Sequence, residues 1–143
     1  MVVASELLGA FGRAGYRLTG PRRVLAELIA SRPGHFTVED LLLASHRDGL
    51  GLGRATVFRA LDTLTELGVV ERLDLPTGEH AFVSCQPAHH HHVVCSACGR
   101  ATPVEGCGLS AMADEVARRT GYSVDAHRVE LFGICPACQA SRA

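Results

Sequence analysis

The stretch RATVFRALDTLTEL, residues 54–67, decides the fold of the first half of this chain. Apolar side chains recur in it at every third or fourth position, which is the period of a helix with one buried face. They form a single stripe: Val57, Ala60, Leu61, Leu64 and Leu67. The other face carries Ala55, Phe58, Arg59, Asp62 and Glu66. An aromatic ring beside an arginine is unusual on a face that meets only solvent, so we expect this helix to bind a partner.

The segments on either side of this helix predict a winged helix-turn-helix domain. Upstream, we expect three helices: one from Glu6, one opened by Thr19-Gly20-Pro21, and one capped by Thr37 with Asp40. Downstream, residues 69–73 and 81–83 are typical of two strands around a turn at 76–79. Several short helices followed by a hairpin is the order of a winged helix, with residues 54–67 as its recognition helix.

A change of pattern after residue 84 predicts a second domain. Its sequence favours short strands at 93–94 and 101–105, a helix from Leu109 that Gly121 ends, and a longer strand at 124–132. The expected fold class is therefore α+β: a winged helix-turn-helix domain followed by a small α+β domain. We place the first domain at residues 1–84, a hinge at 85–91 and the second domain at 92–143.

Charge is distributed unevenly along the chain. The 143 residues carry a net charge of −1, which gives no global indication of a nucleic-acid partner. All the basic residues are arginines, and one segment without any acid holds four of them: Arg13, Arg17, Arg22 and Arg23. This segment is suited to contact phosphates. The alternative is a solvated basic helix face.

Location and catalysis are constrained by what the sequence lacks. It contains no recognisable signal peptide and no window apolar enough to span a membrane, so we expect a cytoplasmic protein. Its motifs do not assemble a nucleophile with an adjacent base, nor an open metal site with a general base. We therefore do not expect an enzyme.

Two pairs of cysteines have the spacing of a zinc site. Cys95-Ser96-Ala97-Cys98 is matched by Cys135-Pro136-Ala137-Cys138 near the end of the chain. In a reducing compartment such pairs are more often metal ligands than disulfides, and together they offer four sulfurs to one tetrahedral ion. We predict structural zinc here, which would reinforce a domain too small for a large core. The alternative is a thioredoxin-like dithiol, which needs one such pair at the start of a helix that follows a strand.

Four consecutive histidines, His89 to His92, precede the first cysteine pair. If this run is extended, side chains alternate, so that His89 and His91 face one way while His90 and His92 face the other. One strand would then serve two metal sites. The alternative is a solvated loop.

The order of these motifs resembles the ferric uptake regulator superfamily over nearly the whole chain. The resemblance rests on AGYRLTGPR at 14–22, RATVFRAL at 54–61, the histidine run before Cys95-x-x-Cys98-Gly99, and the closing Cys135-x-x-Cys138. It implies a homodimeric, metal-dependent transcriptional repressor of metal-uptake genes. In such a protein the winged-helix domain binds palindromic operator DNA and the α+β domain forms the dimer.

The resemblance also implies a regulatory metal site at the hinge. Members similar to the zinc uptake regulator branch use positions that correspond here to Glu71, Cys85, His90 and His92. A thiolate beside two imidazoles and a carboxylate suits tetrahedral zinc, whereas iron and manganese prefer ligands without sulfur. Cys85 therefore distinguishes a zinc sensor from an iron-, manganese- or nickel-responsive one. Two alternatives remain: Cys85 is a small buried apolar residue, or His35 joins His90 and His92 in an iron-type site.

A further site of the superfamily would use His89, His91 and His127, completed by a glutamate from the following helix. That position is Ser110 in this chain, and a serine hydroxyl is a weak ligand. Asp114, Cys107 or water would have to complete the site. The alternative is that His127 is a core histidine.

The resemblance assigns DNA contacts to two parts of the winged-helix domain, the segment around residues 17–22 and the recognition helix. Arg17 corresponds to a basic residue that enters the minor groove, and Arg22 lies in the same motif. On the recognition helix, Thr56 and Phe58 would meet thymine methyl groups, and Arg59 a guanine edge or a phosphate. Phe58 stands where tyrosine is usual, which removes one hydroxyl but keeps the apolar contact.

Two hypotheses from other functional classes remain. The protein could be a peroxide sensor that reacts through its cysteines, or a metallochaperone that binds no DNA.

Overall fold

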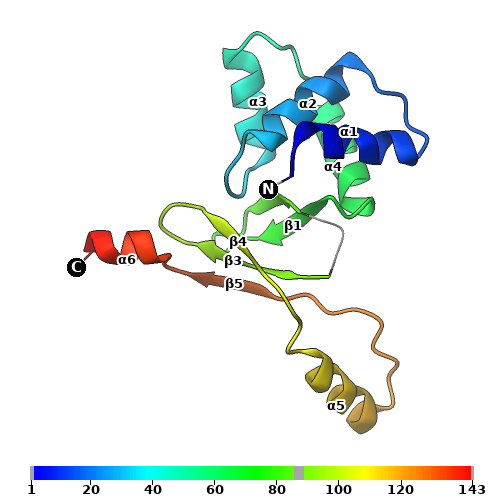
Figure 1. Cartoon of the computed structure of the whole chain (residues 1–143), viewed down its shortest axis with the longest axis vertical. Helices are drawn as coiled ribbons and strands as arrows, with labels where there is room; N and C mark the ends of the chain where they lie inside the picture. The colour runs from blue at the N-terminus through cyan, green and yellow to red at the C-terminus, as the bar shows by residue number, and fades with distance from the viewer. Residues whose placement is uncertain (1, 86–88, 143) are drawn as a thin grey trace. The chain divides into compact units, whose positions relative to one another are not determined.

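The computed structural model describes residues 2–85 and 89–142, and the chain divides into two compact units, Met1–Ala88 and His89–Ala143 (Figure 1). Residues 86–88, which belong to the predicted hinge of 85–91, lie outside the described residues. Each unit is described by itself below.

Four helices build most of the first unit: α1 (Ala4–Arg13), α2 (Gly20–Ala30), α3 (Val38–Arg47) and α4 (Arg54–Glu66). Their ends follow the predicted signals. Thr37 and Asp40 form a capping box, in which the Asp40 N–H donates to Thr37 Oγ1 at 3.1 Å and the Thr37 N–H donates to Asp40 Oδ2 at 2.8 Å. Gly68, just past the end of α4, adopts φ +73°, a left-handed conformation that stops a helix and favours glycine.

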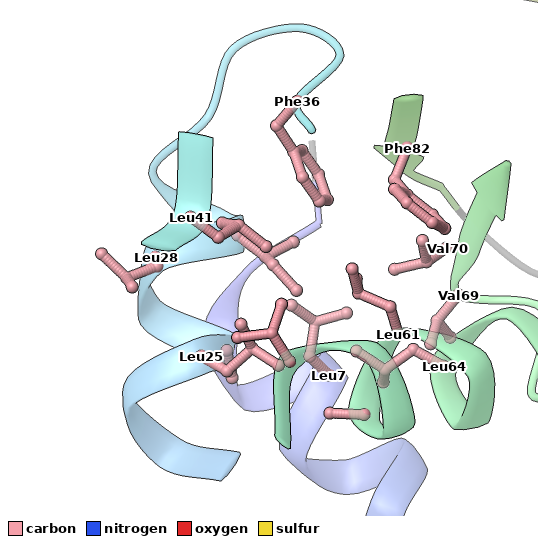
Figure 2. Packing of buried hydrophobic residues seen from close by; sticks show 14 of the residues in the cluster. Leu7, Leu25, Leu28, Phe36, Leu41, Leu61, Leu64, Val69, Val70 and Phe82 are labelled. Carbon is pink, nitrogen blue, oxygen red and sulfur yellow. The ribbon is translucent and has the colours of Figure 1, made fainter. Parts of the chain in front are cut away.

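The core of the first unit lies between these helices. Figure 2 shows Leu7, Leu25, Leu61 and Leu64 converging from α1, α2 and α4. Leu61 and Leu64 belong to the apolar stripe predicted on α4, and both are fully buried. Burial of each such side chain contributes roughly 1.5–3 kcal/mol, so the face of α4 that packs is fixed by this stripe.

A two-stranded antiparallel hairpin completes the first unit: β1 (Val70–Asp74) pairs with β2 (His80–Ser84). A third backbone segment adds to it, because Phe36 and Phe82 exchange N–H···O bonds of 2.8 and 2.7 Å. Their rings stack with centroids 6.2 Å apart, at the edge of the helical core (Figure 2). The loop before α3 is thereby tied to the hairpin, a pairing that the sequence pattern did not predict.

The second unit contains a three-stranded sheet and two helices. Its elements are β3 (His91–Cys95), β4 (Ala101–Val104), α5 (Ser110–Thr120), β5 (Glu130–Gly133) and α6 (Pro136–Arg142). The sheet order is β4-β3-β5, with β3 antiparallel to β4 and parallel to β5. Among the described residues of this unit, only His91, His92, Val94 and Cys95 are buried. A core this small leaves the unit dependent on some other source of stability.

Two features of the second unit differ from the prediction. The strand expected at 124–132 is confined to Glu130–Gly133, because β3 begins at His91 and His92 already pairs with Glu130. In this parallel register the residues before Val129 have no partner in β3, and an alternating pattern alone cannot make a strand. The second difference is α6, which begins inside the closing cysteine pair, at Pro136, and was not predicted.

None of the helices formed by residues 2–85 and 89–142 combines the length and the apolar character needed to cross a bilayer.

Candidate metal centres and nucleic-acid interface

The four cysteines of the two Cys-x-x-Cys pairs come together in the second unit. Cys95 ends β3, Cys98 lies in the turn after it, and Cys135 and Cys138 stand at the start of α6. Their Sγ atoms all lie within 4.8 Å of one another, and the Cys98 and Cys135 sulfurs are 3.8 Å apart. A tetrahedral ion with Zn–S bonds of about 2.3 Å separates its sulfurs by about 3.8 Å, so the Cys98–Cys135 distance matches zinc and the four sulfurs lie close enough to share one ion.

The polypeptide around this cluster favours the thiolate form of Cys95. The Cys135 N–H donates to Cys95 Sγ at 3.3 Å. This bond, with a further one from the Cys98 backbone, lowers the pKa of Cys95 to about 6. The lowered pKa favours the thiolate of Cys95, which is the form that binds metals, whereas hydrogen bonds with Cys135 and Cys98 raise the pKa of Cys138. Cys135 and Cys138 also lie at the start of a helix that follows a strand, as the dithiol alternative requires. The sulfurs of Cys95 and Cys98 lie next to them, however, and this favours a shared metal ion over an isolated dithiol.

The histidine run divides into two pairs, as expected for alternating side chains. His90 and His92 bring their Nε2 atoms to 3.2 Å from each other. His89 and His91 form the second pair, with ring centroids 5.0 Å apart. Two imidazole nitrogens bound to one tetrahedral zinc ion are about 3.3 Å apart, so His90 and His92 can hold one ion without changing their rotamers.

The pair formed by Glu71 and Cys85 lies on the hairpin of the first unit. Glu71 in β1 is opposite Val83 in β2, so Cys85, two residues further on, falls on the same face of the hairpin. The Cys85 N–H donates to the Val69 carbonyl at 3.0 Å, and its sulfur lies 3.8 Å from the Gly68 carbonyl oxygen. Cys85 is thus an extension of β2 held in place by its backbone.

The Cys85 thiol is strongly held in its protonated form. Its burial, and secondarily the negative charge of Glu71, raise the pKa of Cys85 to about 12. A cation near both groups would reverse this, because it stabilises thiolate and carboxylate together and displaces the proton. The buried thiol beside an acid is therefore suited to a metal, although burial alone also fits the apolar alternative. His35, the rival ligand, lies in the loop between α2 and α3.

A third group of ligand atoms gathers His89, His91 and His127 with Cys107. Cys107 Sγ lies 3.1 Å from His127 Nε2, which in turn is 3.4 Å from His91 Nε2. Ser110, the first residue of α5, donates its hydroxyl to the Cys107 carbonyl at 3.4 Å. The sequence offered Cys107 only as one of three ways to complete the site. Its position between Gly106 and Gly108 was the available signal, since a loop so built lets a side chain turn freely toward a neighbour.

The outward face of α4 carries the residues predicted to contact DNA. Phe58 is 45% exposed, Arg59 is exposed, and Thr56 is half-buried near the start of the helix. An aromatic ring left in solvent while its neighbour Val57 is fully buried is the pattern of a helix that presents one face to a partner.

The two arginines of the first motif are not equivalent. Arg22 places its guanidinium 5.2 Å from the ring centre of Phe11 and 5.1 Å from that of Tyr16, and its Nη1 donates to the Arg17 carbonyl at 2.6 Å. Arg17 is exposed. Arg22 therefore holds the loop that presents Arg17. Because its guanidinium is already engaged by this bond and by the two rings, it is less available than Arg17 for a direct contact with DNA.

Comparison with known sequences places these features in one family. A model of the ferric uptake regulator family matches residues 13–132. The zinc uptake regulation protein of Mycobacterium tuberculosis is 34% identical over 127 residues, 89% of this chain and 98% of that protein. The ferric uptake regulation protein of Neisseria meningitidis is 30% identical over 128 residues, 89% of each chain. Relatives named for zinc and for iron are thus of similar closeness.

Solved structures agree with this placement. The structure described as a zinc uptake regulator complexed with zinc and DNA has a TM-score of 0.78 and 26% identity, and the match covers 99% of both chains. The ferric uptake regulator of Vibrio cholerae has a TM-score of 0.63 and 26% identity, covering 89% of this chain and 98% of that one. The expected α+β fold, with a winged helix followed by a small second domain, is confirmed by these likenesses.

Proposed function

The chain belongs to the ferric uptake regulator family, whose members are metal-dependent transcription regulators and not enzymes, and on this basis we propose that it is a zinc-responsive repressor. It binds palindromic operator DNA as a homodimer and controls genes of metal uptake. A DNA-binding regulator of this kind acts in the cytoplasm, where the genome is.

The proposal that the regulatory metal is zinc rests on the ligands of the hinge site. We assign Glu71 and Cys85 from the first unit and His90 and His92 from the second as ligands of one ion. The observation that supports this most directly is the buried Cys85 thiol on the same hairpin face as the Glu71 carboxylate. One sulfur, two nitrogens and one carboxylate oxygen form a ligand set that favours zinc over iron or manganese.

Ligands drawn from both units give the metal its regulatory effect. An ion held by all four fixes the angle between the units, and in a dimer it sets the spacing of two α4 helices. To shift such an equilibrium from mostly open to mostly closed, metal binding must favour the closed form by roughly 5 kcal/mol. A site that is complete only in the closed form supplies this difference.

The remaining metal ligands have other roles in this proposal. Cys95, Cys98, Cys135 and Cys138 bind a structural zinc ion that stabilises the second unit. His89, His91 and His127 contribute to a third site, whose completion is taken up below.

DNA binding is assigned to the exposed face of α4 and to the loop before α2. Phe58 and Thr56 contact thymine methyl groups and Arg59 a base edge or a phosphate, while Arg17 enters the minor groove. Arg22 acts on DNA mainly through its bond to Arg17. The solved relative described as complexed with zinc and DNA supports DNA binding by a chain of this fold.

Homodimerisation through the second unit is supported by its unburied apolar residues. Helix α5 has no buried residue among those described, although Met112 and Val116 lie four positions apart on one of its faces. Tyr122 is 75% exposed just after the helix. Apolar surface of this kind on so small a unit indicates an interface with a second copy.

A single experiment separates zinc from the alternative metals. Protein stripped of loosely held metal by mild chelation is used to select duplexes from a random DNA pool, in parallel with zinc, ferrous iron and manganese. We expect zinc to restore binding to a palindromic duplex at the lowest free metal concentration. Restoration by iron or manganese with no response to zinc would make the protein an iron- or manganese-responsive member, with His35 as the ligand to test next. Binding to no duplex under any metal would contradict the proposal as a whole.

A further inference from the structure

A group of three imidazoles and one thiol lies at the edge of the second unit, away from the four clustered cysteines. His89 and His91 come from the start of β3, Cys107 from the loop before α5, and His127 from the segment before β5. Each offers one ligand atom, and the four atoms lie within 4.8 Å of one another. Three separate segments of chain therefore converge on one point.

The distances in this group are close to those of ligands around one ion, with the sulfur–nitrogen pair slightly shorter. A tetrahedral zinc ion bound to nitrogen at about 2.0 Å and to sulfur at about 2.3 Å separates its ligands by about 3.3–3.8 Å. The structure has 3.1 Å between Cys107 Sγ and His127 Nε2, and 3.4 Å between His127 Nε2 and His91 Nε2. His89 packs edge-on against both other imidazole rings, with centroids 4.7 Å from His127 and 5.0 Å from His91.

The family resemblance expects a metal ligand at position 110, but Ser110 has a different role in this structure. Its hydroxyl donates to the Cys107 carbonyl at 3.4 Å. Gly106, with φ +78°, turns the chain immediately before Cys107 in a conformation that other residues rarely adopt. The first turn of α5 and this glycine together hold the loop so that the cysteine side chain faces the histidines.

We propose that Cys107 is the fourth ligand of this site, which is a thiolate–tri-imidazole zinc site in place of a carboxylate–tri-imidazole one. A sulfur ligand changes the metal preference of the site, because thiolates favour zinc and cobalt while manganese and ferrous iron favour oxygen. This extends the proposed function to the third metal site of the same protein. Its test needs neither DNA nor the hinge ligands, so either proposal can fail without the other.

Cobalt(II) serves as the probe, because a thiolate bound to it gives a charge-transfer band in the near ultraviolet that imidazole and carboxylate ligands lack. The full-length chain carries Cys85→Ser, which removes the other thiol outside the four-cysteine cluster, and the cluster is kept filled with zinc and its content checked. Cobalt is then titrated into this protein and into versions that also carry Cys107→Ser or, as a control at an exposed serine outside this group of ligands, Ser123→Ala.

We expect the band in the Cys85→Ser protein and in the Ser123→Ala control, and its loss in the Cys107→Ser protein. Competition with a chelator should show zinc affinity at this site lower by at least about tenfold without Cys107, since even outer partners of metal ligands change affinity by about 10–100-fold. Unchanged circular dichroism and retained cluster zinc show that each variant is folded. Cobalt binding without the band in the Cys85→Ser protein, or an identical band and affinity after Cys107→Ser, would overturn the assignment.

Discussion

Cys107 Sγ lies 3.1 Å from His127 Nε2, although 20 residues separate the two in the sequence. Cys98 and Cys135 are also close in space although distant in sequence: 37 residues separate them, and their sulfurs lie 3.8 Å apart. The second unit has few buried apolar side chains, so we expect metal ions bound at these two clusters to supply the stability that a hydrophobic core gives a larger domain. The stability of the second unit should therefore follow its metal content.

We predict that Cys98→Ser removes the structural zinc and unfolds the second unit while leaving the first unit folded. Cys98 is exposed, so the substitution disturbs no packing, and what is lost is part of the roughly 10–16 kcal/mol that structural zinc contributes to small domains. Metal analysis and amide hydrogen exchange measure both effects. Ser96→Ala, in the same turn, is the control and should keep zinc and protection. Protected amides in β3 after Cys98→Ser would show that the sheet does not depend on the ion.

The two faces of α4 should respond oppositely to substitution. Leu61→Ala removes a fully buried side chain and should lower the free energy of unfolding of the first unit by about 2–5 kcal/mol. Phe58→Ala, at a side chain that is 45% exposed, should leave stability almost unchanged and weaken DNA binding instead. Denaturant titration and fluorescence anisotropy with a selected duplex separate the effects. Equal DNA affinity for Phe58→Ala and the unaltered protein would remove α4 from the interface.

Arg22→Lys should weaken DNA binding even though it keeps the charge. Lysine cannot reproduce the guanidinium's cation–π contacts with Phe11 and Tyr16 together with the bond to the Arg17 carbonyl, and each such contact is worth about 0.5–1 kcal/mol. Because no charge is lost, the slope of affinity against salt should stay the same. Arg17→Ala is the contrasting variant and should reduce that slope by about 1. Full tolerance of lysine at position 22 would mean that Arg22 acts only as a charge.

Met112→Glu combined with Val116→Glu should convert the proposed homodimer to a monomer. The two side chains are exposed on one face of α5, and a carboxylate buried opposite its symmetry mate is costly. Light scattering after size-exclusion chromatography gives the mass in solution. Leu43→Glu on α3, where the side chain is 74% exposed in the first unit, is the matched control and should remain dimeric. A dimer that survives the double change would place the interface elsewhere.

The first unit follows closely from local signals in the sequence. The box of Thr37 and Asp40, the stop at Gly68 and the stripe through Leu61 and Leu64 each act within a few residues of where they stand. Such signals do not depend on distant partners, so the pattern alone predicts the helices and the buried face of α4. The pairing of Phe36 with Phe82 escaped prediction because it joins segments that are distant in sequence and lacks a pattern of its own.

The second unit is where prediction from sequence reached its limit. Whether residues before Glu130 form a strand depends on where β3 begins, and that is a tertiary fact. Cysteine and histidine spacing predicted which residues are candidate ligands, but the choice among Cys107, Asp114 and water required the path of the loop. The alternation of His89 to His92 was predictable because it depends only on an extended backbone.

The most direct test of the zinc-sensing proposal is a zinc titration of DNA binding for the unaltered protein and for Cys85→Ser, both with zinc in the four-cysteine cluster. We expect the unaltered protein to gain affinity for its selected duplex as free zinc rises. The Cys85→Ser protein should keep its fold and cluster zinc, yet require at least about tenfold more zinc for the same affinity. An identical zinc midpoint for the two proteins would contradict the assignment of Cys85 as the sensing ligand.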